Sequence, residues 1–146
     1  LGGLNILEAY IYHIESRNQY EVKIRLGGPR LSIKAHNLIY KLDENVILAI
    51  RFEDVYIFPN NYHFQDSRAD WSNLVTCSAR ITEKFLTGKE LMFVLELDNG
   101  DQIKVKKPEI MQFDLSLGDQ ILVGFFPDDF HMFKYPDNLQ HELALQ

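Results

Sequence analysis

The chain has 146 residues, enough for one ordinary domain or two very small ones. Its 46% hydrophobic and 25% charged residues are typical of a soluble globular protein, and the 12% aromatic share favours β structure. The net charge of −6 argues against a broad phosphate-binding surface, and a single cysteine, Cys77, excludes an internal disulfide.

The first 35 residues predict three strands. In residues 5–14, Leu7, Ala9 and Ile11 share one face, and polar residues then break the pattern. From residue 20 the alternation returns, and it places Tyr20, Val22, Ile24 and Leu26 on one face. Gly27-Gly28-Pro29 turns the chain, and residues 31–35 resume the alternation, so these two segments predict a hairpin.

One stretch of the sequence occurs twice. Residues 42–58 and residues 117–133 align without a gap at an offset of 75 (117 − 42). Each copy has a polar turn, an apolar run, an acidic turn ending in Asp and a second apolar run. Residues 46–50 are apolar at every position, which predicts a strand covered on both faces. This internal repeat predicts two copies of one small β unit.

A long irregular segment, residues 59–73, separates the copies. A loop of this length is either a linker or a functional loop. Its aromatic side chains make bare exposure improbable, so we expect it to pack on something. Two interpretations stay open: a seam that seals the two halves, or a contact with a partner. The candidate interaction residues are Tyr62, Phe64, Arg68, Asp70 and Trp71.

The second half repeats the order of the first. Residues 74–81 predict a strand with Cys77 on its inner face, and residues 86–90 predict a hairpin turn. Residues 91–98 and 103–106 alternate on either side of Asn99-Gly100, which predicts a type I′ turn. The tail hints at one or two helical turns.

These elements predict an all-β protein with little helix, made of two tandem OB-like small β-barrels, packed together or partly intertwined. Each unit has fewer than about 65 residues, which is marginal for an independent core. The expected division is residues 1–58 for the first repeat, 59–73 for the linker loop, 74–133 for the second repeat and 134–146 for the tail.

Catalytic motifs are missing from the sequence. There is no phosphate-binding GxxxxGK[ST] loop, and no His or Cys pair has metal-ligand spacing. The acidic pairs of the two copies occupy equivalent positions after a buried strand, so we interpret them as structural, with side chains that accept backbone N–H bonds. We expect no enzyme activity, no catalytic or metal residues and no bound cofactor. The predicted structural turn residues are Arg51, Glu53, Asp54, Asn99, Gly100, Asp128 and Asp129.

Three motifs resemble the TOBE (transport-associated OB) domain, whose barrels are similar to those of MOP-like proteins. Arg51-Phe52-Glu53-Asp54-Val55 resembles its "RPEDI" motif, and residues 124–133, GFFPDDFHMF, resemble its "W-x-PEDVHVF" ending. Residues 3–9, GLNILEA, resemble the entry that follows the nucleotide-binding domain in such proteins.

The resemblance implies the regulatory and dimerisation domain of the ATP-binding subunit of an ABC-type importer, of the spermidine/putrescine or iron(III) type before the sugar type. The implied partners are an upstream nucleotide-binding domain, a second copy of the ATPase subunit and the permease subunits. The parent chain would bind ATP and Mg, and the fragment would lie on the cytoplasmic side of the membrane.

Two other functions remain open from the sequence. The first is a sensor that binds oxyanions or polyamines between the barrels. The second is an OB module for single-stranded nucleic acid, with Tyr10, Tyr12 and Phe64 as stacking platforms, although a basic groove is missing and no nucleic-acid partner is expected.

Overall fold

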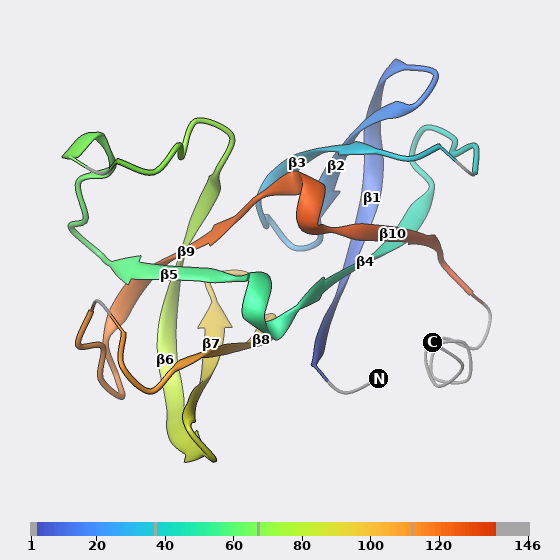
Figure 1. Ribbon diagram of the computed structural model, residues 1–146. Helices are drawn as coiled ribbons and strands as arrows, with labels where there is room; N and C mark the ends of the chain where they lie inside the picture. The colour runs from blue at the N-terminus through green and yellow to red at the C-terminus, as the bar shows by residue number, and fades with distance from the viewer. Residues whose placement is uncertain (1–2, 37, 67, 112, 137–146) are drawn as a thin grey trace.

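The structure, a computed structural model, describes residues 3–36, 38–66, 68–111 and 113–136 (Figure 1). Within these residues it is all-β, as predicted, with ten strands and three single 3-10 turns. The strands are β1 (Leu4–Ser16), β2 (Gln19–Ile24), β3 (Arg30–Lys34), β4 (Asn45–Arg51), β5 (Tyr56–Pro59), β6 (Val75–Thr87), β7 (Glu90–Leu97), β8 (Gln102–Pro108), β9 (Gln120–Phe125) and β10 (His131–Lys134). The 3-10 turns are η1 (Phe52–Asp54), η2 (Phe64–Asp66) and η3 (Pro127–Asp129).

The ten strands form two curled antiparallel sheets of five. The order is β10-β4-β1-β2-β3 in the sheet that we call the first barrel and β5-β9-β6-β7-β8 in the second barrel. The two orders correspond strand by strand, so the structure confirms two similar OB-like units. The helical turns expected in residues 139–145 lie outside the described residues.

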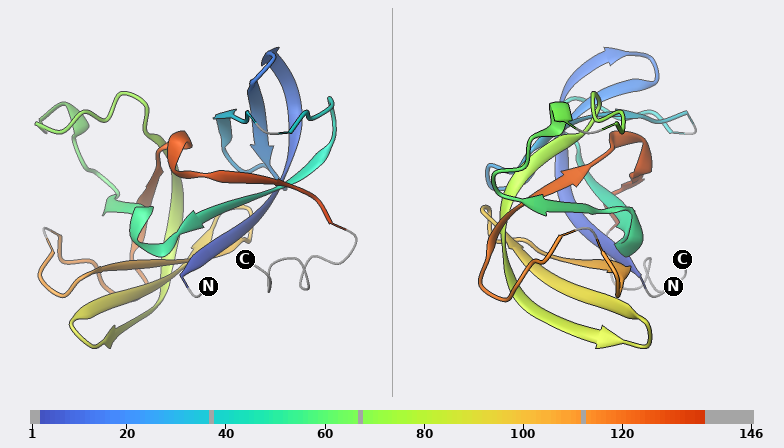
Figure 2. Two further views of the ribbon diagram at one scale, coloured as in Figure 1. Left: turned by 45° about the vertical axis from the view of Figure 1, so that its right-hand side comes forward. Right: turned by 60° about the vertical axis from the view of Figure 1, so that its left-hand side comes forward.

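The two barrels exchange one strand each. β5 follows β4 in the chain but pairs with β9 of the second barrel, and β10 follows β9 but pairs with β4 of the first. Both crossings are visible in Figures 1 and 2, where β5 and β10 run in opposite directions between the barrels. The intertwined form of the predicted fold is therefore the observed one. The sheets do not follow the repeat boundaries expected at residues 58 and 74, and these boundaries stay a prediction.

The buried faces follow the predicted alternation. Leu7, Ala9 and Ile11 are each at most 4% exposed, and so are Tyr20, Val22 and Ile24 of the opposite strand. In β4 all five residues from Val46 to Ile50 are buried, because one face meets the core and the other is also covered. Burial on both faces explains why this stretch carries no polar side chain.

Leu26 departs from the predicted face. It is 74% exposed and has a φ of +56°, so β2 ends at Ile24 and not two residues later. The backbone N–H of Gly28 donates to the carbonyl of Ile24 and closes the turn. A Cβ at Gly28 would lie 2.7 Å from the Ile24 side chain, so the turn requires glycine there.

The Asn99-Gly100 turn also differs from the prediction. Gly100 has a φ of +91°, whereas Asn99 does not have the positive φ that a type I′ turn requires. The N–H of Leu97 donates to the carbonyl of Asp101, and that of Gly100 donates to the carbonyl of Leu97. The loop therefore has three residues, with glycine in the left-handed position after a tight turn. This leaves the Asn99 side chain free to bond other groups.

Polar contacts join the two barrels at two places. Arg25, just after β2, donates through Nε (3.1 Å) and Nη2 (2.9 Å) to the Asp101 carboxylate and also pairs with Glu8. Asn99 Nδ2 donates to the carbonyl of Arg25 at 2.8 Å. At the second place the Asn5 side chain bonds both main-chain groups of Lys104, at 2.8 and 2.7 Å. Both contacts bridge more than 70 residues of sequence, so they fix the barrels relative to each other.

Asn5 gives a first testable prediction. It is 6% exposed, and its replacement by alanine removes both bonds to Lys104 and leaves two main-chain groups unsatisfied. We expect Asn5→Ala to lower the free energy of unfolding by about 1–3 kcal/mol. Urea unfolding followed by circular dichroism measures this loss, and Asn61→Ala, at an exposed asparagine, serves as the control. Equal stability of the two variants would contradict the prediction.

Candidate functional site

The two acidic turns of the repeat are equivalent in the structure, as the sequence predicts. η1 (Phe52–Asp54) links β4 to β5, and η3 (Pro127–Asp129) links β9 to β10, so each turn lies where the chain crosses to the other barrel. The N-cap residues of the two turns, Arg51 and Phe126, make no side-chain cap bond, and the structural role expected of the acidic side chains stays a prediction. Backbone bonds from Asp129 N–H to Phe126 and from Phe130 N–H to Pro127 hold η3.

Carboxylates of both turns influence each other electrostatically. The pKa of Asp129 is raised, first by burial and then by the negative charges of Asp54 and Asp128. The nearby Lys107 has a lowered pKa because it is buried, an effect that Asp54 and Glu53 oppose. Lys107 Nζ lies 4.9 Å from the centre of the Tyr56 ring. Arg51 contacts Glu53 at 3.7 Å, but both side chains are largely exposed and the pair contributes little.

The raised pKa of Asp129 predicts a pH effect. A carboxyl whose pKa is raised in the folded state destabilises the fold when ionised, and this effect disappears as pH falls through the folded-state pKa. At pH 7 we expect Asp129→Asn to be as stable as wild type or more stable, by less than about 1 kcal/mol because the group is only partly buried. Near pH 4 the difference should shrink. Urea unfolding at both pH values checks this, and a difference that grows on acidification would contradict it.

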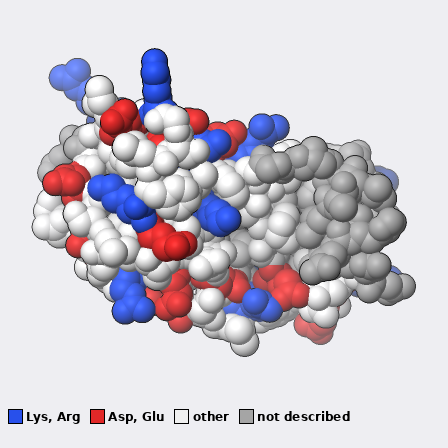
Figure 3. Space-filling model, turned by 90° about the horizontal axis from the view of Figure 1, so that it is seen from below, with Lys and Arg blue, Asp and Glu red and all other residues white. Residues whose placement is uncertain are grey.

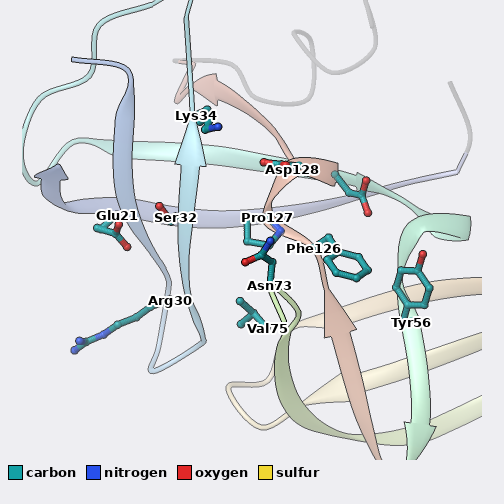
Figure 4. A pocket seen from close by; sticks show the side chains of 11 residues that line it. Glu21, Arg30, Ser32, Lys34, Tyr56, Asn73, Val75, Phe126, Pro127 and Asp128 are labelled. Carbon is teal, nitrogen blue, oxygen red and sulfur yellow. The ribbon is translucent and has the colours of Figure 1, made fainter. Parts of the chain in front are cut away.

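A cleft of about 760 Å³ lies between the barrels beside η3 (Figure 4). Arg30, Ser32 and Lys34 of β3 form its first-barrel wall. The facing wall belongs to the second barrel and to η3, and it includes Tyr56, Asn73, Val75, Phe126, Asp128 and Asp129. Its volume is in the range of small-molecule sites.

The cleft carries charges of both signs. Arg30 and Lys34 of β3 line it, and Glu21, Asp128 and Asp129 line it as well. Arg30 lies over the Tyr12 ring at 5.0 Å, and the pKa of Tyr12 is raised, mainly by burial and then by Glu21. No group of three His, Cys, Asp or Glu with the geometry to hold a metal occurs in the described part of the chain. The arrangement can bind a charged or polar ligand.

The aromatic residues of the 59–73 loop pack together. Tyr62 and Phe64 contact each other at 4.9 Å, and both contact Phe58 of β5. Trp71 stacks on Phe126 at 5.9 Å, and its buried Nε1 has no hydrogen-bond partner within the described residues. The ring contacts that the structure shows are therefore with the second barrel.

The two charged candidates of this loop, Arg68 and Asp70, are exposed. Asp70 accepts hydrogen bonds from the Ser72 N–H and hydroxyl, which lower its pKa. The aromatic side chains of the loop therefore pack against the second barrel, and these two charged side chains are exposed to solvent. A partner contact at Tyr62, Phe64, Arg68, Asp70 and Trp71 stays a prediction.

Cys77 is partly buried against the core of the second barrel, and burial, aided by Asp98, raises the pKa of its thiol from 9.0 to about 12. Because the thiolate is the reactive form, we expect alkylation by iodoacetamide at pH 8 to be about 1,000-fold slower than for a free thiol. Mass spectrometry measures the rate, and the same protein in 8 M urea is the control. Rapid labelling of the folded chain would contradict the assignment.

The sequence did not point to Arg30, Ser32, Lys34 or Val75 as cleft residues. They belong to strands of different repeats, and only the packing of the barrels brings them together. One signal was available: by the repeat register, Val75 corresponds to Asn5, so the two copies differ at this position.

Comparison with known proteins agrees with this architecture. Residues 48–133 match the TOBE domain family. No curated protein matches the sequence. Among solved structures, the chain is similar to the cytoplasmic molybdate-binding protein ModG in its PEG-grown form with molybdate bound, with a TM-score of 0.67 and 14% identity over 92% of this chain and 99% of that chain. At this identity the likeness shows a shared fold.

The described residues contain no helix long and apolar enough to cross a membrane. The family match spans both crossings between the barrels, from β4 through η1 to η3 and β10. It covers 86 of 146 residues (133 − 48 + 1), more than half of the chain. This chain belongs to the TOBE domain family.

Proposed function

We propose that this chain is the regulatory and dimerisation domain of the ATP-binding subunit of an ABC-type importer. Its TOBE family membership carries the proposal, because the matched region contains both acidic motifs that resemble the importer ATPases. The missing GxxxxGK[ST] loop agrees with a domain that carries no nucleotide site of its own. The importer would carry a polyamine or iron(III), and a sugar is the next candidate.

The exchanged strands suit such a role. A rotation of one barrel against the other would have to break the pairing of β5 or β10, so the two barrels move as one body. The partners in this proposal are the upstream nucleotide-binding domain, a second copy of the same subunit and the permease. The domain would lie on the cytoplasmic face of the membrane.

The coding sequence upstream of Leu1 tests the proposal. We expect it to encode a Walker A loop, a signature motif and a Walker B strand. The polypeptide that contains both parts should hydrolyse ATP, whereas residues 1–146 alone should give no heat with ATP in calorimetry. Light scattering of the longer polypeptide should give a dimer mass. A start codon at Leu1 would contradict the proposal.

A second candidate function is small-ligand sensing, which the cleft between the barrels favours. ModG is a molybdate-binding protein, and by analogy an oxyanion would contact Arg30 and Lys34. A polyamine would instead contact Glu21, Asp128 and Asp129. Calorimetry with molybdate, sulfate and spermidine separates these ligands. Loss of molybdate or sulfate binding in Lys34→Ala would support the oxyanion site. Loss of spermidine binding in Asp128→Asn would support the polyamine site. No heat for any ligand leaves the regulatory role alone.

Nucleic-acid binding gains no support from the arrangement. Phe64 packs against Phe58 of the second barrel, whereas Tyr10 and Tyr12 belong to β1 of the first, so the predicted platforms lie on different barrels. On the face shown in Figure 3, basic and acidic side chains are interspersed among the described residues. A single-strand site normally combines stacking with a basic groove.

A further inference from the structure

The strand β3 is an edge of the first barrel. In an antiparallel pair, residues alternate between those that bond the neighbouring strand and those whose N–H and C=O point away from it. The bond from Ile24 N–H to the Pro29 carbonyl fixes this alternation for β2 and β3. It follows that Arg30, Ser32 and Lys34 direct their main-chain groups away from β2, toward the open edge.

The equivalent edge of the second barrel is occupied. There the bond from Leu97 N–H to Asp101 fixes the alternation, and Lys104 directs its main-chain groups outward. Both groups are bonded by the carboxamide of Asn5, at 2.7 and 2.8 Å. A carboxamide has the same donor and acceptor as a peptide group, so Asn5 acts here as a one-residue substitute for a neighbouring strand.

The first barrel lacks this substitute. Asn5 pairs with Ile50 in the first barrel, and Val75 pairs with Phe125 in the second, at the repeat offset of 75 (125 − 50). Val75 is therefore the counterpart of Asn5, as Ser32 is of Lys104, and its side chain has no hydrogen-bonding group. Both Val75 and Ser32 line the cleft (Figure 4). The cleft thus lies at the position where, in the second barrel, Asn5 bonds the edge strand.

The open edge is without a partner in the described part of the chain. No side chain or turn described in the structure bonds the outward N–H or C=O of Ser32. Exposed strand edges bind extended peptides by adding a strand, with main-chain bonds that supply affinity. Two cationic side chains, Arg30 and Lys34, lie at the ends of the edge, and the carboxylates of Glu21, Asp128 and Asp129 line the same cleft.

We propose that the β3 edge in this cleft binds an extended peptide segment of a partner protein by strand addition. The peptide pairs its own main chain with Arg30, Ser32 and Lys34, and its acidic side chains at alternate positions face Arg30 and Lys34. The edge is recessed between the barrels, so a single extended chain reaches it while the sheet of a second folded copy does not. This inference is independent of the importer assignment.

The probe is the peptide acetyl-Thr-Glu-Val-Thr-Val-Glu-Thr-amide. Its central Thr pairs with Ser32, and its two Glu residues lie opposite Arg30 and Lys34. The control peptide is the same sequence N-methylated at both Glu residues and at the central Thr, which removes the ladder bonds and keeps every side chain. Binding is followed by the amide NMR signals of the 146-residue protein and by hydrogen exchange.

We expect saturable binding of the unmodified peptide with a Kd below about 1 mM and no binding of the methylated one. In the free protein, the amide of Ser32 should exchange rapidly and that of Lys104 slowly, and the peptide should slow exchange at Ser32. Protection of Ser32 in the free protein equal to that of Lys104, equal binding of the two peptides, or no binding of either would overturn the proposal. So would a concentration-dependent dimer that itself protects Ser32.

Two variant pairs test the same edge from the protein side. Val75→Asn supplies the missing carboxamide. It should protect the Ser32 amide from exchange and lower the affinity for the peptide at least tenfold. The isosteric Val75→Thr should change neither the exchange nor the affinity. Ser32→Pro removes the outward N–H and should also abolish binding, while Ser32→Ala keeps it. If Val75→Asn does not fold, the proline and alanine pair decides. Unchanged affinity in Ser32→Pro would overturn the proposal.

Discussion

Residues 1–58 and residues 59–146, expressed as separate polypeptides, are expected to be unfolded alone and to fold when mixed. The first piece contains β5 without its partner β9, and its β4 lacks β10. Ile47 and Leu48, buried in the whole protein, would lose their cover at that edge. With fewer than about 60 residues and an incomplete sheet, the piece cannot bury enough surface to be stable.

Circular dichroism and the dispersion of amide NMR signals measure the extent of folding of each piece and of the equimolar mixture. A matched control restores the missing strand: residues 1–54 are joined through a Gly-Ser linker to residues 130–134, which include β10. This chain should be more structured than residues 1–58, although it is of similar length. A native-like spectrum for residues 1–58 alone would show that the exchange is not needed for folding.

Phe125→Ala is expected to cause the largest loss of stability from a single substitution. The side chain is fully buried in β9, and its ring lies 5.5 Å from that of Phe130. Removing it leaves a cavity and costs about 3–5 kcal/mol. This is a large share of the 5–15 kcal/mol typical of a native protein.

Urea unfolding followed by circular dichroism and by Trp71 fluorescence measures the loss. Ile110→Ala removes an aliphatic side chain that is 92% exposed, and it should change the free energy of unfolding by less than about 0.5 kcal/mol. Because Phe130 leads directly into β10 of the first barrel, both probes should report one transition. Two separate transitions would contradict the coupling of the barrels.

Local pattern predicted much of the fold. The alternation in residues 20–24 and 31–34 and the Gly-Gly turn between them located the β2–β3 hairpin, because a strand's two faces differ in polarity. The apolar run at residues 46–50 predicted a strand buried on both faces, and β4 is one. The repeat itself predicted equivalent acidic turns, which η1 and η3 confirm.

What depended on distant packing could not be assigned from the sequence. Residues 56–58 have the same pattern whichever sheet they join, so the sequence permitted an intertwined fold without locating the exchanged strands. The turn at Asn99 does not have the type I′ form, and the Asn99 side chain bonds Arg25 and Asp101 in the contact between the barrels, a contact that the local pattern does not reveal. The cleft is lined by residues of both barrels, and among them Val75 stands where the other copy has Asn5.

The strand exchange also constrains how such a protein could have arisen. A single repeat with this connectivity cannot complete its own sheet, since its last strand leaves for another sheet. It could fold only by receiving that strand from an identical chain, as a two-fold symmetric dimer. Duplication and fusion of such a gene would keep the fold, fix the ratio of the two units at one to one, and allow positions such as 5 and 75 to diverge.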